Sequence, residues 1–365
     1  MRTRTPPEAV EKYPPDTCFV IQCRLATLPI GLADQCHRHT IGRPEVEVTM
    51  SPYLLSRREF SARCSATAVG ALLAVQGSTR IVAAADAATQ GAGRTVKLPD
   101  GTAVPAIGQG GWHLGQGKHP EAIEEEAVRT GLSLGMTLID TSGNYGGGRS
   151  EQFLGHVIAG QRDRVFLVSK VEPHDVGGDG MARACDASLA RLGTDHLDLY
   201  LLHHSVATRK FSGVVAAFER LRGAGKIRAW GVSNFDRGQM DDLFRVPDGQ
   251  HCATNQVSYS LRKRRIERDL LPWCAQHSMP VMAYSPLGGD HHLVIGDPTL
   301  AKIGAAHGCS AAAVALAWVV RGGNVIAIPE SGSSGHTKEN AVALSVTLTA
   351  QDVQTLDAVF PGPHS

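Results

Sequence analysis

Two side chains that could take part in acid–base chemistry, Asp140 and Tyr145, share one short segment, residues 136–155. The apolar run 136–139 predicts a buried parallel strand that ends at Asp140. A glycine-rich loop then presents Tyr145, and Ser150 offers N-cap chemistry for a following helix. A carboxylate and a phenol are therefore expected on one strand-to-helix loop. Taken alone, the same pair could be a strand-end cap and a half-buried aromatic.

Two further polar residues follow later predicted strands. Lys170 comes after the strand at 165–169, and His203 comes after the strand at 197–202. If these strands run parallel in a barrel, their carboxyl ends meet on one face, and the sequence predicts that Asp140, Tyr145, Lys170 and His203 converge there.

This set of residues fits the protonation of a carbonyl oxygen. A phenol has a pKa near ~10, so it is a weak acid at neutral pH. A buried Lys170 should lower the pKa of Tyr145, Asp140 should hold the lysine charged, and His203 can hydrogen-bond the substrate oxygen. The set holds neither a Ser or Cys nucleophile paired with a base nor a cluster with metal-ligand spacing. A hydride from a bound cofactor is therefore the expected attacking species.

The elements that must position these residues alternate between strand and helix from Arg94 onward. An Asp-Gly turn at 100–101 between short apolar runs predicts an N-terminal β-hairpin. The predicted strands are 106–108, 138–140, 165–169, 197–202, 229–232, 254–257, 281–283 and 325–328, and the amphipathic segments include 121–134, 181–192, 214–222, 266–277, 311–320 and 350–360. Eight such units predict the α/β fold of a closed (β/α)₈ TIM barrel. An open doubly wound sheet is the alternative, but no G-x-G-x-x-G follows the first strand.

Composition narrows the classes of partner. The formal net charge is +1, so the chain has no overall basic bias and no nucleic-acid partner is expected. The local run 262–265 (RKRR) is interpreted as a solvated loop and first helical turn. Eight cysteines without a CxxC pattern indicate neither a metal site nor a disulfide framework.

Several motifs in order along residues 94–360 resemble the aldo-keto reductase family, in particular its bacterial short-loop, methylglyoxal or diketogulonate reductase-like members. They are GGW at 110–112, IDTSGNYG at 139–146, VSK at 168–170, LDLYLLH at 197–203, GVSNF at 231–235, NQV at 255–257, AYSPL at 283–287, IPES at 328–331 and Glu339-Asn340. The resemblance implies NAD(P)H-dependent reduction of aldehydes and ketones. Tyr145 would be the general acid, Lys170 its activator, Asp140 the partner of Lys170, and His203 the group that orients the carbonyl.

The same resemblance assigns residues to the cofactor and the substrate. The cofactor-binding set would be Ser233, Asn234, Gln256, Tyr284, Ser285, Leu287, Glu330, Ser331, Glu339 and Asn340. Of these, Ser233, Asn234 and Gln256 would hold the nicotinamide carboxamide, and Tyr284 would stack on its ring. Trp112 and His204 would line the substrate pocket. Tyr284 and Trp112 could instead be packing aromatics.

The chain departs from the family pattern in three places. Glu330 stands where a Lys often meets the 2′-phosphate of NADP, and His336 stands where many members have an Arg. A carboxylate would repel that phosphate but can accept a hydrogen bond from a ribose 2′-hydroxyl, so the preference for NADP(H) over NAD(H) is in doubt. An alternative is that Glu330 faces solvent and Lys338 serves the phosphate. His204 replaces a common Trp, and the loops are short, so small aldehydes or dicarbonyls are the expected substrates.

The first 92 residues lack the alternating pattern. Residues 1–49 are interpreted as an upstream, disordered segment, and residues 50–92 resemble a twin-arginine export signal with its linker. Ser56-Arg57-Arg58-Glu59-Phe60 matches the S-R-R-x-F core, an apolar stretch follows, and small residues stand at A-x-A spacing near Ala85. Arg63 and Arg80 depart from a clean apolar region. We therefore expect residues 93–365 to form the barrel and the protein to reach the periplasm or exterior, or otherwise to stay cytoplasmic.

Two other functions remain open at this stage. A nucleotide-binding barrel could act as a redox sensor or partner subunit, and Lys170 could form a Schiff base in a lyase. We expect a monomer that binds a small carbonyl substrate and is not stably inserted in a membrane.

Overall fold

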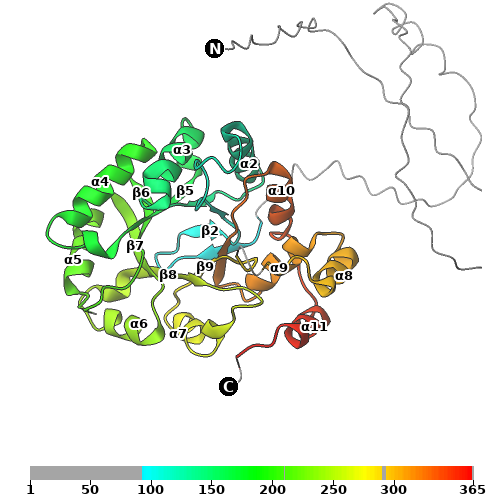
Figure 1. Cartoon of the computed structure of the whole chain (residues 1–365). Coiled ribbons are helices and arrows are strands. Elements are labelled where there is room, and N and C mark those ends of the chain that lie inside the picture. The colour runs from blue at the N-terminus through cyan, green and yellow to red at the C-terminus, as the bar shows by residue number, and fades with distance from the viewer. Residues whose placement is uncertain (1–92, 209, 290–292, 364–365) are drawn as a thin grey trace, which may run out of the picture. The chain divides into compact units, whose positions relative to one another are not determined.

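The computed structural model describes residues 93–208, 210–289 and 293–363. The predictions for residues 1–92 therefore lie outside the described part. The chain begins with an antiparallel hairpin of β1 (Thr95–Lys97) and β2 (Ala103–Pro105). Val96 and Val104 of the hairpin are almost fully buried, so the hairpin covers the core, and in Figure 1 it lies across the centre of the ring. The N-terminal hairpin prediction is confirmed.

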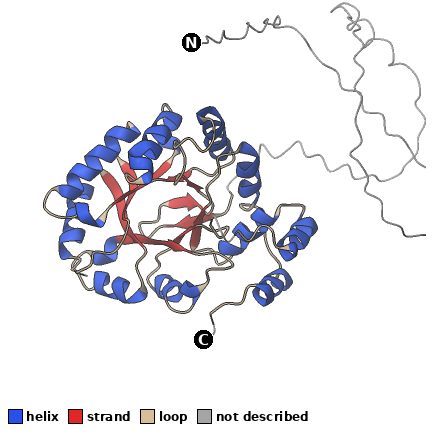
Figure 2. Ribbon diagram, viewed as in Figure 1, coloured by secondary structure: helices blue, strands red, loops and turns tan. Residues whose placement is uncertain are grey.

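Eight parallel strands form a barrel (Figures 1 and 2). They are β3 (Gln109–Gly110), β4 (Leu138–Asp140), β5 (Phe166–Val171), β6 (Leu197–Leu202), β7 (Ile227–Ser233), β8 (Cys252–Ser258), β9 (Val281–Tyr284) and β10 (Val325–Ile328). Neighbours in sequence are neighbours in the sheet, from β3 to β10. Parallel bridges Ile107↔Ala327 and Gly110↔Glu330 join the first strand segment to the last, which closes the barrel. The predicted TIM barrel is confirmed.

Helices surround the strands (Figure 2). They are α2 (Glu121–Ser133), α3 (Arg149–Ile158), α4 (Gly180–Leu192), α5 (Ser212–Gly223), α6 (Arg237–Phe244), α7 (Leu270–Gln276), α8 (Pro298–His307), α9 (Ala311–Val319), α10 (Ser334–Val342) and α11 (Ala350–Val359). Helix α10 packs against α2, so the outer ring closes beside the strand closure.

The sequence explains these elements. Strand β6 (LDLYLL) is buried along its whole length, as expected for a parallel strand covered on both faces. Helix α6 begins with a capping box in which Asp236 and Gln239 satisfy each other's backbone N–H groups. Helix α8 begins with Asp297 as N-cap and Pro298 in its first turn, where a proline costs no hydrogen bond.

Two sequence predictions about element bounds need correction. The first barrel strand is Gln109–Gly110 rather than 106–108. The amide of Ala106 bonds to Arg94 in the hairpin base, so this residue connects the hairpin to the barrel. The helix predicted at 266–277 is divided into a 3₁₀ turn, Arg265–Glu267, and α7, with the break before Leu270.

The basic run at 262–265 was interpreted as solvated, which is wrong for Arg264. This side chain is almost buried, forms ion pairs with Glu267 (2.8 Å) and Asp357 (2.7 Å), and lies over the Trp318 ring. Burial alone would lower the pKa of Arg264, but its hydrogen bonds to Glu267 and Asp357 raise it above its usual value. The run therefore contributes to packing of the C-terminal helix.

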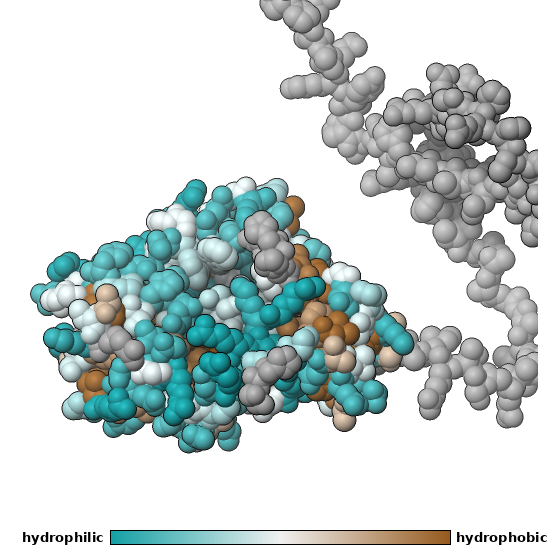
Figure 3. Space-filling view, turned by 60° about the horizontal axis from the view of Figure 1, so that its bottom comes forward, coloured by the Kyte–Doolittle hydropathy of each residue, from teal (hydrophilic) through white to brown (hydrophobic). Residues whose placement is uncertain are grey.

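The face of the barrel shown in Figure 3 is predominantly hydrophilic, with hydrophobic residues in small areas. Among the described residues no single helix has the length and apolar character needed to cross a bilayer. Helices α8 and α9 meet that test only as a pair bent by 91°.

Candidate active site

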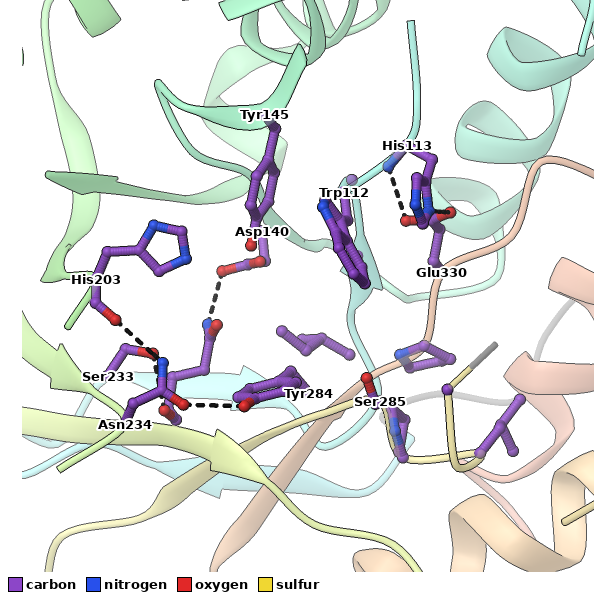
Figure 4. Close-up of a pocket in the computed structure, with 18 of the residues that line it drawn as sticks. Trp112, His113, Asp140, Tyr145, His203, Ser233, Asn234, Tyr284, Ser285 and Glu330 are labelled. Carbon is purple, nitrogen blue, oxygen red and sulfur yellow. Dashed lines mark hydrogen bonds and ion pairs between the residues drawn. The ribbon is translucent and has the colours of Figure 1, made fainter. Parts of the chain in front are cut away.

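A cavity of about 550 Å³ opens where the barrel strands end. Its lining comes from many strand ends and includes Gly110, Gly111, Trp112, His113, Asp140, Tyr145, His203, His204, Ser233, Asn234, Gln256, Tyr284, Ser285, Leu287, Pro329 and Glu330. Its volume lies in the range typical of small-molecule sites. The side chains labelled in Figure 4 point into this space.

Lys170 is at the centre of the polar contacts below the cavity. Its ammonium group is fully buried and donates to Asp140 Oδ2 (2.7 Å), to the Thr141 carbonyl (2.9 Å) and to Tyr145 Oη (3.0 Å). Burial favours the neutral amine, but Asp140 and Tyr145 outweigh it and hold the pKa of Lys170 above its usual value. The other Asp140 oxygen accepts from Gln256 Nε2 at 2.7 Å. The lysine is therefore a fixed cation beside the phenol.

Tyr145 begins the kinked turn Tyr145–Gly148, whose backbone is not helical at Gly146 and Gly147, and it lines the cavity. Gly146 and Gly147 have φ values of 60° and 67°, a left-handed conformation that favours glycine. Burial raises the pKa of Tyr145 above its ordinary value, and Lys170 opposes this shift without reversing it. The expected lowering of the Tyr145 pKa by Lys170 is therefore present, but burial outweighs it and the net shift is upward. The phenol keeps its proton at neutral pH, as a proton donor must.

Ser150 does not act as the N-cap that the sequence suggested. Helix α3 is preceded by Gly148 in the left-handed conformation, and the Ser150 hydroxyl is buried. It donates to the Gly111 carbonyl (2.6 Å) and shares a hydrogen bond with Thr141 Oγ1 (2.8 Å). Ser150 therefore ties the loop after β3 to the end of β4, which holds the two sides of the cavity together.

His203 lies beside Tyr145, with ring centroids 5.7 Å apart in an edge-to-face arrangement. Its Nδ1 is 2.5 Å from the Glu172 carboxylate. Burial lowers the pKa of His203 and Lys170 lowers it further, whereas Glu172 acts in the opposite direction. The ring of His204 stacks on His203 at 4.8 Å, on the exposed side of the cavity.

The side-chain hydroxyl and amide groups of Ser233, Asn234 and Tyr284 form a polar surface, here called the polar shelf, opposite the Tyr145 phenol. Asn234 Nδ2 donates to the His203 carbonyl (3.1 Å) and to Ser233 Oγ (3.1 Å), and its Oδ1 accepts from Tyr284 Oη (2.9 Å). The Ser233 hydroxyl donates to the Gln256 carbonyl at 2.9 Å. Asn234 has a φ of 62°, a strained value for a residue with a side chain. The shelf is thus held in one shape before any ligand binds.

Glu330 faces the cavity rather than bulk solvent. Its carboxylate accepts from the His113 backbone N–H (2.9 Å) and meets His113 Nδ1 at 2.8 Å, as Figure 4 shows. Neither sequence interpretation of Glu330 included this contact. Any contact between Glu330 and a ribose would compete with His113. Lys338, the alternative phosphate partner, is exposed on α10.

The remaining predicted residues divide into two groups. Trp112, 54% exposed and stacked on His113, lines the cavity together with Ser285 and Leu287. Ser331, Glu339 and Asn340 do not line it. The Ser331 hydroxyl donates to the Ser333 carbonyl (2.8 Å) at the start of α10, and the other two lie on that helix. The structure therefore brings together the predicted catalytic residues and most of the residues predicted to bind the cofactor, whereas Ser331, Glu339 and Asn340 lie outside the cavity. The roles of all these residues remain predictions.

Sequence reasoning missed His113 and Glu172. Glu172 is a polar residue at the end of β5, two positions after Lys170, so the strand-end rule could have found it. His113 follows Trp112 in a loop, and its contact with Glu330 joins residues far apart in sequence. That contact left no local signal.

Among the described residues, Glu172, His203 and His204 could place ligand atoms within 4.8 Å of one another. The two imidazole rings are nearly parallel, at 13°, so their in-plane lone pairs do not converge on one ion. The site fits organic ligands better than a metal ion.

The geometry can be compared with known proteins. The model of the aldo/keto reductase family matches residues 106–292 and 294–360. Methylglyoxal reductase YeaE of Escherichia coli (strain K12) is 45% identical over 273 residues, which cover 74% of this chain and 96% of that protein. A crystal structure of an aldo/keto reductase from Klebsiella pneumoniae in complex with NADP and acetate has a TM-score of 0.72 and 45% identity, and the match covers 75% of this chain and 98% of that one. A second Klebsiella pneumoniae structure, in complex with NADPH, has a TM-score of 0.71 and 44% identity over 75% and 97% of the two chains.

Proposed function

Because the chain belongs to the aldo/keto reductase family, we propose that it reduces small aldehydes and ketones to alcohols with Tyr145 as the general acid. NAD(P)H-dependent carbonyl reduction is the activity of this oxidoreductase. The observation that carries the assignment of the acid is the contact of Lys170 Nζ with both Asp140 and Tyr145 in the cavity wall.

Each of the four catalytic residues would have a separate role in carbonyl reduction. A bound reduced nicotinamide supplies the hydride. Tyr145 donates its proton to the carbonyl oxygen, and Lys170 stabilises the phenolate that remains because its ammonium group lies 3.0 Å away. Asp140 holds Lys170 charged and in place. His203, edge-on to the phenol, orients the carbonyl oxygen between the two rings.

The nicotinamide end of a dinucleotide fits the residues present. The Tyr284 side chain would cover the ring, and Ser233, Asn234 and Gln256 would bind its carboxamide, for which the preformed polar shelf offers hydroxyl and amide groups. Ser285 and Leu287 would lie along the diphosphate, and Ser331, Glu339 and Asn340 would meet the adenosine. NADP and NADPH are bound by similar solved structures, so we propose NADP(H) as a cofactor, with its preference over NAD(H) weakened by Glu330.

We propose small, polar carbonyl compounds of the methylglyoxal kind as substrates. His204 gives the exposed side of the cavity a polar surface, and Trp112 forms an open wall. The relative that is 45% identical over most of both chains is a methylglyoxal reductase. These observations favour a small substrate over a bulky apolar one.

The test measures reduction of methylglyoxal by the full chain with NADPH and NADH side by side, with Tyr145→Phe as control. We expect turnover with the wild type and its loss in the variant, which keeps the ring but lacks the acidic hydroxyl. Nucleotide binding without turnover of several small aldehydes would refute the reductase proposal and favour the sensor alternative. Irreversible trapping by borohydride with substrate would instead favour a Schiff-base lyase.

We propose further that residues 50–92 act as a twin-arginine signal and that the barrel is exported folded, with its nucleotide bound. The S-R-R-x-F match at 56–60 supports this proposal. Cell fractionation of the wild type and an Arg57→Lys, Arg58→Lys variant tests it: we expect the wild type alone in the periplasm. Equal cytoplasmic retention of both, or periplasmic protein without nucleotide, would contradict it.

We also infer a monomer; in its support, hydrophilic residues dominate the one face that Figure 3 shows. Light scattering of the purified protein measures its mass directly, and a stable dimer would overturn this inference.

A further inference from the structure

A second cavity, of about 370 Å³, lies behind the catalytic residues. It is lined by Lys170, Glu172, His174, Asp175, Arg191 and Tyr200, among others. The His174 side chain is 77% exposed, so the cavity reaches solvent. The Tyr200 hydroxyl is buried near the Ser188 side chain, and no hydrogen bond of normal geometry satisfies it within the described part of the chain. Because buried hydroxyls are normally satisfied, this cavity is suited to hold water.

Glu172 connects the two cavities. It follows β5 directly, lines the second cavity, and places its carboxylate 2.5 Å from Nδ1 of His203, which lines the first. Both side chains are largely buried, at 16% and 13% exposure. A carboxylate with water on one side and an imidazole on the other has the position of a proton carrier.

The hydrogen bond between these residues also decides which nitrogen of His203 carries its proton. An ionised Glu172 accepts a hydrogen bond, so the proton of a neutral His203 lies on Nδ1. The Nε2 atom then has no proton to donate to a carbonyl oxygen. If the Glu172–His203 pair holds one more proton, Nε2 of His203 carries a proton again. Either His203 is then protonated on both nitrogens, or protonated Glu172 donates to Nδ1 and the histidine proton lies on Nε2. The charged and titratable groups that face His203 are Lys170, Glu172, His204 and Tyr145.

Reduction consumes one proton in every turnover, and a bound substrate and nicotinamide would occupy the front cavity. On the premise of the reductase function, we propose that Glu172 is a positioning residue that draws this proton from water in the second cavity and passes it to His203. The alcohol O–H bond forms as the Tyr145 O–H bond breaks. The phenolate regains a proton from His203 Nε2, and His203 regains one at Nδ1 from protonated Glu172. Glu172 then takes up the hydrated solvent proton that each reduction consumes, which reaches it through water in the second cavity.

The test compares Glu172→Gln with Asp175→Asn. Asp175 is a matched control because it lines the same cavity, pairs with His174 (3.5 Å) and contacts none of the catalytic residues. We expect Glu172→Gln to lower kcat about ten- to a hundredfold while changing KM for methylglyoxal less than about threefold, since proton transfer and not binding is impaired. Formate or imidazole added to the buffer should restore kcat in a Glu172→Ala variant, whose shortened side chain leaves room for a small acid beside His203 Nδ1. Asp175→Asn should keep kcat within about twofold.

Nitrogen-15 NMR of the His203 ring gives a readout that needs no turnover. We expect the wild-type proton on Nδ1 and a lower pKa of His203 in Glu172→Gln, because the carboxylate raises it. An Nε2–H tautomer in the wild type would overturn the proposal. So would an unchanged kcat in Glu172→Gln, or a loss of kcat in Glu172→Ala that no small acid restores. A wild type without turnover would refute the reductase function, and NMR would still decide the placement of the proton.

Discussion

Replacing Lys170 by Met should damage stability and activity by separate routes. The ammonium group is fully buried and, among the residues that the structure describes, is one of two hydrogen-bond partners of the Asp140 carboxylate, the other being Gln256 Nε2. Met has a similar length but no charge. The variant therefore leaves a carboxylate in the core with only the Gln256 amide.

The cost follows from that unpaired charge. Removing one partner of a buried ion pair typically costs about 3–5 kcal/mol. For a domain of this size, that cost corresponds to a fall in Tm of roughly 6–20 °C. The loss of Lys170 also removes the cation that stabilises the phenolate, so kcat should fall by about 10²–10⁴.

The double variant Asp140→Asn, Lys170→Met separates the two effects. Because neither side chain of this pair is then charged, it should regain most of the lost Tm, but it should stay as inactive as Lys170→Met. Thermal unfolding followed by circular dichroism and methylglyoxal turnover measure the two quantities. A Lys170→Met protein whose Tm equals that of the wild type would refute the reasoning, as would a double variant less stable than the single one.

Three other outcomes are expected. Tyr145→Phe should keep the wild-type Tm within a few degrees and lose about 10²–10⁴ in kcat; a variant with more than a tenth of wild-type kcat would remove Tyr145 from the role of acid. Burial alone would raise the pKa of Glu267, but hydrogen bonds from Arg264 lower this pKa below its usual value. Ionised Glu267 therefore stabilises the folded state at pH values above the usual pKa of a glutamate. This stabilisation is lost as the pH falls through the folded-state pKa. Unfolding measured between about pH 3 and 6 should show a weaker acid dependence in Glu267→Gln, and equal slopes would contradict this. Glu330→Lys should raise the preference for NADPH, measured as kcat/KM with NADPH divided by kcat/KM with NADH, about fivefold, or roughly 1 kcal/mol. The reason is that the variant lacks the carboxylate charge that repels the 2′-phosphate. An unchanged ratio would place Glu330 away from the phosphate.

Periodicity and motif order were sufficient for most of the barrel. The strands at 138–140, 197–202 and 325–328 have the predicted bounds because continuous apolar runs ended by polar residues are typical of central parallel strands. The catalytic side chains converge because parallel strands end on one face.

The errors have a common physical origin in contacts between distant residues. Arg264 was interpreted as solvated because its partner Asp357 lies on the C-terminal helix, which no local pattern connects to it. Ser150 looked like an N-cap, but the Gly111 carbonyl on another loop binds its hydroxyl. The sign of the Tyr145 pKa shift depends on how burial compares with the charge of Lys170, and residue types alone do not supply that comparison.

The closure of the barrel sets an order of events during synthesis. Ile107 pairs with Ala327, some 220 residues later in the chain. At about 5–20 residues per second, the ribosome takes roughly 11–44 s to make that interval. The first strand segment must therefore wait, with one edge unpaired, until nearly the whole chain has been made. While this strand edge is unpaired, a nascent chain can form incorrect strand pairs at it. An export system that accepts only folded proteins would therefore have to act after the last strand has left the ribosome.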